Sequence, residues 1–176
     1  MNVGYNEIGK AQALNLVSIF KQKDQMKSVG LEGCNLGVDG AKAVADYVSI
    51  SAVLTSINLS SNQLCGFNWN DEGIYTAEGI TAIADALHVN SALTELNLSL
   101  NRIGAEGAKP LADALCVNSS LTEVRLSDFE RVLSMLSCSD PCLLCVGKPP
   151  RQPALWGLEN GRARKESLRC PERHLH

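Results

Sequence analysis

Apolar residues along the chain follow two different periods. Short stretches such as residues 54–59 carry them at Leu54, Ile57 and Leu59, which is typical of a strand with one buried face. The longer stretches in between carry them every three to four positions, the period of a helix with one apolar face. Four such sets share one register: Ala13, Leu16, Val17 and Phe20; Ala41, Val44, Ala45 and Val48; Ile80, Ile83, Ala84 and Leu87; Ala108, Leu111, Ala112 and Leu115. The chain is therefore predicted to alternate short strands with amphipathic helices.

The strand-like stretch returns at a fixed interval. Residues 54–64 (LTSINLSSNQL) return as residues 93–103 (LTELNLSLNRI) and in part as residues 121–127 (LTEVRLS). Their pattern, L-x-x-L-x-L-x-x-(N/C)-x-L, is the signature of leucine-rich repeats, whose units bury their apolar faces only by stacking on one another. We therefore predict an α/β fold, a short open solenoid of about four strand–turn–helix units of 28 residues, one of which carries an 11-residue insertion.

One polar position of the pattern has a clear physical reason. It is occupied by Asn6, Cys34, Asn62 and Asn101, at spacings of 28, 28 and 39 residues. Where the chain turns from strand to helix, inward-facing N–H and C=O groups lack a ladder partner, and an Asn amide can donate to and accept from them. We expect the three Asn residues to form a structural turn ladder and Cys34 to be a structural thiol.

The interval of 28 residues, the long helices and endings such as Leu115-Cys-Val-Asn-Ser-Ser-Leu121 resemble the ribonuclease-inhibitor-like class of leucine-rich repeats. That class also includes the repeat domains of NOD-like receptors and the Ran GTPase-activating protein. The resemblance covers about residues 1–127. It implies protein–protein recognition, with no cofactor and no catalysis by the repeats themselves, and it does not fix the partner.

Charge and composition narrow the possible partners. Residues 1–127 hold 8 Lys and Arg against 13 Asp and Glu, a poor match for the phosphates of a nucleic acid. The first twenty residues contain no long apolar run, so we expect no signal peptide, and no stretch is long enough to span a membrane. We expect a cytoplasmic monomer with reduced cysteines.

The pattern divides the chain into two parts. Residues 1–137 are predicted to form the solenoid, closed by a makeshift helical cap after Asp128. Residues 138–176 hold five of the six Pro and four of the seven Cys, lack the repeat pattern and are predicted to be disordered. The tail cysteines leave open a zinc site of Cys142, Cys145, Cys170 and His174, or less plausibly an iron–sulfur cluster on Cys138, Cys142 and Cys145; free thiols, with no metal, are expected.

Two surfaces are candidates for partner binding. The concave face is predicted to present strand residues that alternate with the buried ones, above all Ser56, Asn58, Glu95, Asn97, Glu123 and Arg125. The insertion, residues 66–76, brings together three aromatic residues and two acids, namely Phe67, Trp69, Asp71, Glu72 and Tyr75. Binding hot spots favour aromatic residues and Arg, so the inserted loop is preferred over the concave face as a binding surface. The first interpretation of the insertion itself is a self-packed loop whose aromatic residues cover the adjoining helix, and a partner-binding loop is the second.

The sequence therefore predicts a protein-interaction module that binds through the solenoid and its inserted loop. Two alternatives stay open: a regulator of a small GTPase, by analogy with the Ran activator, and a truncated repeat fragment without function.

Overall fold

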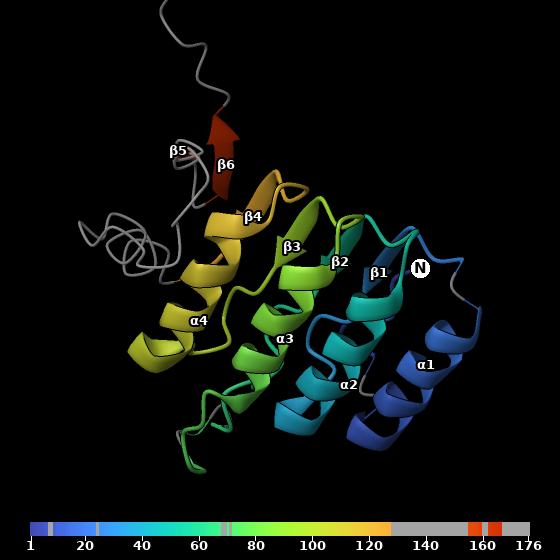
Figure 1. Ribbon diagram of the computed structural model, residues 1–176. Helices are drawn as coiled ribbons and strands as arrows, with labels where there is room; N and C mark the ends of the chain where they lie inside the picture. The colour runs from blue at the N-terminus through green and yellow to red at the C-terminus, as the bar shows by residue number, and fades with distance from the viewer. Residues whose placement is uncertain are drawn as a thin grey trace, which may run out of the picture.

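The computed structural model describes residues 1–6, 9–23, 25–67, 70, 72–127, 155–159 and 162–166. In the amino-terminal part, helices α1 (Gly9–Lys23), α2 (Gly37–Ile50), α3 (Glu78–Val89) and α4 (Gly104–Val117) alternate with strands β1 (Ser28–Gly30), β2 (Ser56–Asn58), β3 (Glu95–Asn97) and β4 (Glu123–Arg125). The helices lie side by side in one layer and the strands in another (Figure 1). The predicted alternation of strands and helices is confirmed.

The strands β1 to β4 form a parallel sheet in chain order. The register is constant, so Ser28, Ser56, Glu95 and Glu123 stand opposite one another as Cα partners. The middle residue of each strand is buried against the helices, as Ile57 is, while its neighbours in β2, β3 and β4 are exposed or half-buried. Because side chains alternate between the faces of a strand, this spacing places one polar set on the face turned away from the helices.

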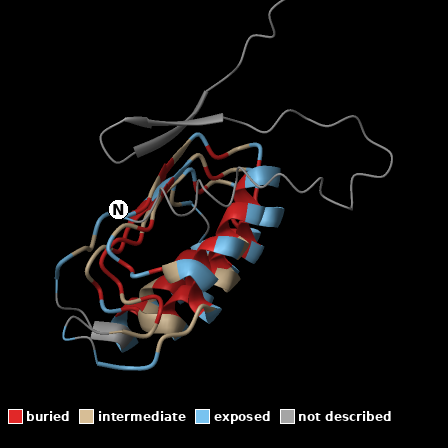
Figure 2. Cartoon of the chain, turned by 90° about the vertical axis from the view of Figure 1, so that its left-hand side faces the viewer, coloured by how far each residue is buried: buried red, intermediate tan, exposed pale blue. Residues whose placement is uncertain are grey.

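The core lies between the two layers (Figure 2). Its buried apolar residues run from Ala13 to Leu126. All of the predicted helix-face residues are buried except Leu16, which is half-buried. Leu16 belongs to α1, which has a packed helical neighbour only in α2 among the described residues.

Part of the carboxyl-terminal tail adds to this sheet. Strands β5 (Leu155–Glu159) and β6 (Arg162–Glu166) pair antiparallel, and β6 lies antiparallel beside β4. This pairing differs from the disorder predicted for residues 138–176. Its physical reason is the open edge of β4, whose N–H and C=O groups can pair with a further strand.

Other predictions for the tail fall outside the described residues. These are the helical cap after Asp128 and the cysteine and histidine side chains considered for metal binding. Within the described part of the chain, no helix combines the length and apolar character required to cross a membrane.

Candidate partner-binding surfaces

The sheet face turned away from the helices carries a shallow hollow of about 180 Å³. Its lining includes all the residues predicted for the concave face: Ser56, Asn58, Glu95, Asn97, Glu123 and Arg125. We call these six residues the sheet face. The constant parallel register brings them together from three strands, since Ser56, Glu95 and Glu123 share one row and Asn58, Asn97 and Arg125 the next.

Hydrogen bonds link many of these polar groups to one another. Ser56 Oγ donates to Glu95 Oε2 at 3.0 Å, and Arg125 Nε donates to Glu123 Oε1 at 2.9 Å. Asn58 Nδ2 donates to the carboxylate of Glu32, which follows β1 in the unit before. The sheet face thus holds the carboxylates of Glu95 and Glu123, a third carboxylate, Glu32, bonds to its edge, and only Glu123 pairs with the Arg125 guanidinium; Glu95 is exposed. The surface is chemically suited to accept hydrogen bonds from a basic partner.

The turn ladder joins neighbouring units through buried amides. Asn62 Oδ1 accepts from the Cys34 N–H at 2.9 Å, and its Nδ2 donates to the Leu31 carbonyl at 2.7 Å. One unit further, Asn101 Oδ1 accepts from the Asn62 N–H at 2.9 Å, and its Nδ2 donates to the Leu59 carbonyl at 2.9 Å. Each amide therefore satisfies backbone groups of its own unit and of the unit before it.

Asn6 and Cys34 hold the same sequence position with different surroundings. Asn6 is exposed, and its Nδ2 donates to the Gly4 carbonyl at 3.2 Å, a bond within its own turn. Cys34 is buried, and its Sγ donates weakly to the carbonyls of Val3 and Glu32 at 3.6 Å. Burial, followed by the Glu32 carboxylate, raises the pKa of the Cys34 thiol, so this thiol is poorly ionised at neutral pH.

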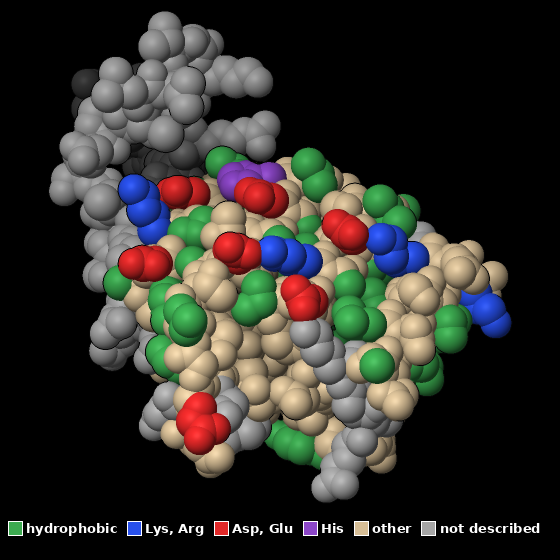
Figure 3. Space-filling model, turned by 90° about the horizontal axis from the view of Figure 1, so that it is seen from below, with side chains coloured by type: hydrophobic (Ala, Val, Ile, Leu, Met, Phe, Trp, Pro, Cys, Tyr) green, Lys and Arg blue, Asp and Glu red, His purple; other side chains and the backbone are tan. Residues whose placement is uncertain are grey.

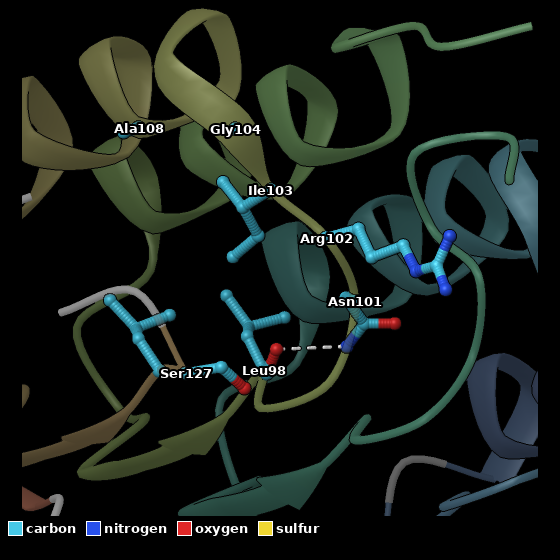
Figure 4. A pocket seen from close by; sticks show the side chains of 8 residues that line it. Leu98, Asn101, Arg102, Ile103, Gly104, Ala108 and Ser127 are labelled. Atoms are coloured by element: carbon cyan, nitrogen blue, oxygen red, sulfur yellow. Dashed lines mark hydrogen bonds between the residues drawn. The ribbon is translucent and has the colours of Figure 1, made fainter. Parts of the chain in front are cut away.

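A small cleft lies beside Asn101 at the β4 end of the stack (Figure 4). Leu98, Ile103 and Ser127 contribute to its lining, and Asn101 Nδ2 donates to the Leu98 carbonyl there at 2.9 Å. Its volume of about 10 Å³ has room for about one water molecule. Pockets for small molecules typically measure ~300 Å³ or more, so neither this cleft nor the hollow on the sheet face has that form.

The insertion is closed at its neck by backbone contacts. Thr76 N–H donates to the Cys65 carbonyl at 3.1 Å, which joins the two ends of the loop. Gly66 and Gly73 cross there with φ of +87° and +121°, and a Cβ on Gly73 would meet the Gly66 carbonyl oxygen at 2.3 Å. Both positions therefore require glycine, and the loop has a defined neck.

Tyr75 anchors the loop to the following unit. Its hydroxyl donates to the Ile103 carbonyl and accepts from the Gly107 N–H at 3.2 Å, and its ring lies 6.0 Å from that of Phe67. Burial, which disfavours the charged phenolate, is the main reason that the pKa of the Tyr75 hydroxyl is raised. Tyr75 thus holds the insertion against the start of α4. For this residue, the contact agrees with a loop that packs on the protein itself.

The rest of the inserted loop is partly exposed. Glu72 is exposed, and Ile74, which sequence reasoning did not single out, is 87% exposed. Trp69 and Asp71 lie outside the described residues. Among the described residues, Ile74 is the most exposed large apolar side chain.

A second Asn ladder, not predicted from the sequence, lies at the turns from helix to strand. Asn90 Nδ2 donates to the carbonyls of Val48 and Ser51 at 2.7 and 2.9 Å, and Asn118 Nδ2 donates to those of Leu87 and Asn90 at 2.7 and 3.0 Å. These amides satisfy the turns from helix to strand. The signal was present in the sequence, since Ser51, Asn90 and Asn118 repeat the spacings of 39 and 28 residues.

Comparison with known proteins supports the leucine-rich-repeat assignment. Residues 89–112 match a family described as Leucine Rich repeat. Among solved structures, one described as "Leiomodin-1 Actin-Binding Site 2 (ABS2)" is similar, with a TM-score of 0.63, 24% sequence identity and 78% of each chain covered. A search of curated proteins found no match. Together, the family match and the shared fold support a leucine-rich-repeat protein, a type of domain that commonly mediates protein–protein interaction.

Proposed function

We propose that this chain is a non-catalytic protein-binding module, a leucine-rich-repeat solenoid of about four units of the ribonuclease-inhibitor-like class. The observation that carries the proposal is the sheet face. Three consecutive strands hold six polar residues in constant register around one hollow, which offers a broad surface for a macromolecule. The match over residues 89–112 and the shared fold support the same proposal.

The charges of the sheet face favour a basic segment of the partner. Glu95 is exposed, and its carboxylate can accept from a guanidinium or ammonium group in addition to Ser56. Glu123 already pairs with Arg125 in the free protein. A cationic group of the partner would therefore share the Glu123 carboxylate with the Arg125 guanidinium. Complementary charge of this kind raises association rates and makes binding sensitive to salt.

The inserted loop is proposed as a second contact. Ile74 supplies exposed apolar surface, and Trp69 is the aromatic residue of the loop whose role in binding stays a prediction from the sequence. Tyr75 is better regarded as the anchor that fixes the loop. Binding would therefore combine polar contacts on the sheet face with an apolar contact at the rim.

The proposal is tested by affinity capture from the source cell followed by direct binding measurements with the purified partner. A sheet-face variant carries Glu95→Lys and Glu123→Lys. A loop variant replaces residues 65–76 by one glycine, so that Leu64-Gly-Ala77-Glu78-Gly79 matches Ile103-Gly104-Ala105-Glu106-Gly107 of the next unit. Asp39→Lys, an exposed change on α2 at a residue that belongs to neither surface, is the charge control.

We expect each of the first two variants to weaken binding by at least about tenfold, or about 1.4 kcal/mol, and the control to have little effect. Actin belongs among the purified candidates, because the structure of similar fold is described as an actin-binding site. A partner that binds both variants as tightly as the wild-type protein would contradict the proposed surfaces. A failure of any protein to bind would contradict the function itself.

We further propose that the protein acts as a cytoplasmic monomer that does not bind nucleic acid or membranes. The excess of acidic residues over residues 1–127 supports the exclusion of nucleic acid. Light scattering of the purified protein, cell fractionation and binding to DNA, RNA and anionic vesicles test these points. The regulation of a small GTPase stays a prediction that a nucleotide-turnover assay can test.

A further inference from the structure

Three neighbouring helices end in an exposed aliphatic residue. Ile50 of α2, Val89 of α3 and Val117 of α4 are the last residues of their helices and are 60, 67 and 63% exposed. They hold the same position of the repeat, at spacings of 39 and 28 residues, and the three helices pack side by side. These residues therefore form a row along the stack, which we call the aliphatic rim.

A row of acidic residues accompanies the rim. Asp46, Asp85 and Asp113 are all exposed and stand four residues before Ile50, Val89 and Val117 in their helices. Residues four apart on a helix are neighbours on its surface, with Cβ atoms about 5–6 Å apart. This aspartate row thus runs beside the aliphatic rim across the same helices. Figure 3 shows acidic, basic and hydrophobic side chains interspersed over the helix layer.

One contact in the protein shows that a cation fits this row. Lys21 Nζ of α1 lies 3.3 Å from Asp46 Oδ2 of α2. The equivalent positions in the next two helices are held by Ser49 and His88, and within the described residues Asp85 and Asp113 form no ion pair. The carboxyl ends of the helices also carry partial negative charge. The surface beyond Asp46 therefore favours positive charge from another molecule.

We propose that the aliphatic rim and the aspartate row together dock a basic amphipathic α-helix of a partner protein. Packed helices lie about 8–10 Å apart, and seven residues of an α-helix rise about 10.5 Å. Apolar residues at every seventh position of the partner helix would then meet Ile50, Val89 and Val117 in turn, with Lys or Arg one turn away facing the aspartates. A helix about 10–12 Å wide covers both rows, whereas an extended chain covers one.

This surface differs from the sheet face, so its test is independent of the proposed function. The probe is an Ala-based helical peptide with Leu at every seventh position and Lys one turn from each Leu. Its binding to the full chain is measured by fluorescence anisotropy. A matched peptide carries Glu in place of Lys, and a third peptide is a Pro-rich extended chain with the same Leu and Lys content.

We expect the basic helical peptide to bind, and to bind at least about tenfold more weakly to an Ile50→Ser, Val89→Ser, Val117→Ser variant. Asp85→Asn with Asp113→Asn should reduce both its affinity and its salt dependence. The matched change Asp39→Asn with Glu106→Gln, at exposed carboxylates in the first turns of α2 and α4, should leave its binding unchanged. Because the rim residues are exposed, their replacement should leave the circular dichroism spectrum unchanged and the melting temperature within about 4 °C.

Several results would overturn the proposal. Absence of binding by the basic peptide, or equal binding by the rim variant, would remove the rim as a docking surface. Equal binding of the Glu-containing peptide would remove the charge complementarity. Tighter binding of the Pro-rich peptide would show that an extended segment, and not a helix, fits the two rows.

Discussion

At the residue scale, the turns from strand to helix combine an unfavourable backbone conformation, with positive φ, with a buried side chain that in two of them is an Asn amide. The residues on either side of Cys34, Asn62 and Asn101 adopt positive φ: Gly33 and Asn35, Ser61 and Gln63, Leu100 and Arg102, all between +53° and +62°. Only Gly adopts this conformation at no cost, and residues such as Leu100 are disfavoured there. The amides compensate by satisfying several buried backbone groups at once, so the turn is stabilised from inside the stack.

The turn ladder predicts that replacing two asparagines at equivalent positions, Asn101 and Asn6, changes the free energy of unfolding by very different amounts. Asn101→Ala should lower the free energy of unfolding by roughly 1 to 3 kcal/mol, because it leaves the N–H of Asn62 and the carbonyls of Leu59 and Leu98 without their partner. The matched control Asn6→Ala should have an effect below about 0.5 kcal/mol, since Asn6 is exposed. Urea denaturation measures both values. Equal effects would contradict the structural role assigned to the buried amide.

The cysteines of the stack predict a selective pattern of alkylation. Burial raises the pKa of Cys65 to about 12 and also raises the pKa of Cys34, so the reactive thiolate is scarce at pH 7 to 9 in the folded protein. Cys116 is exposed. Among these three cysteines, iodoacetamide should therefore modify Cys116 first, faster at pH 9 than at pH 7, and reach Cys34 and Cys65 only after unfolding. Peptide mapping by mass spectrometry identifies each site, and early modification of Cys65 would contradict its burial.

At the scale of elements, the insertion between β2 and α3 is a closed loop fixed at two places. Its neck depends on the close approach of Gly66 and Gly73, and Tyr75 ties it to the turn that starts α4. Two neighbouring residues of the loop, Ile74 and Tyr75, therefore have different surroundings. Tyr75 stabilises the junction of two units, whereas Ile74 is presented to solvent.

Tyr75→Phe should destabilise the protein by about 1 kcal/mol or more, because the carbonyl of Ile103 and the N–H of Gly107 lose their shared partner. Tyr5→Phe is the matched control, since Tyr5 is 68% exposed, and should change stability by less than about 0.5 kcal/mol. Thermal and urea unfolding provide the comparison. If both substitutions had the same small effect, the hydroxyl of Tyr75 would not anchor the loop.

At the scale of the whole molecule, stability depends on stacking along one direction. The buried apolar residues extend from Ala13 to Leu126, and each helix packs against the helix of the neighbouring unit. Strand β6 pairs with the edge of β4. The aliphatic rim, the sheet face and the inserted loop present different side chains to solvent. One short stack therefore presents several chemically distinct surfaces to solvent.

Removal of residues 139–176 should preserve cooperative unfolding, because the core described lies before residue 127. The loss of the strand beside β4 should cost about 1 to 2 kcal/mol and expose backbone groups that promote self-association. Calorimetry measures the first effect and light scattering over a range of concentrations the second. A truncated chain without a cooperative transition would show that the tail is required for folding.

The sequence by itself determined the alternation of strands and helices, the apolar face of each helix and the row of Asn and Cys positions. These features could be predicted because each depends on a short period within one unit, and the same period recurs in the next. The residues of the sheet face followed from the same alternation along a strand. The protein-binding role rests on the type of fold, and the extent of the domains and the roles of the inserted-loop residues stay predictions.

Only the tertiary structure decided how residues of different units meet. Tyr75 reaches Ile103, Asn90 reaches Val48, and β6 pairs with β4, contacts between positions that are far apart in the sequence. The aliphatic rim likewise became a surface only when the ends of three helices were placed side by side. Local periodicity specifies what each unit buries, whereas packing between units decides which of the remaining side chains are anchors and which face solvent.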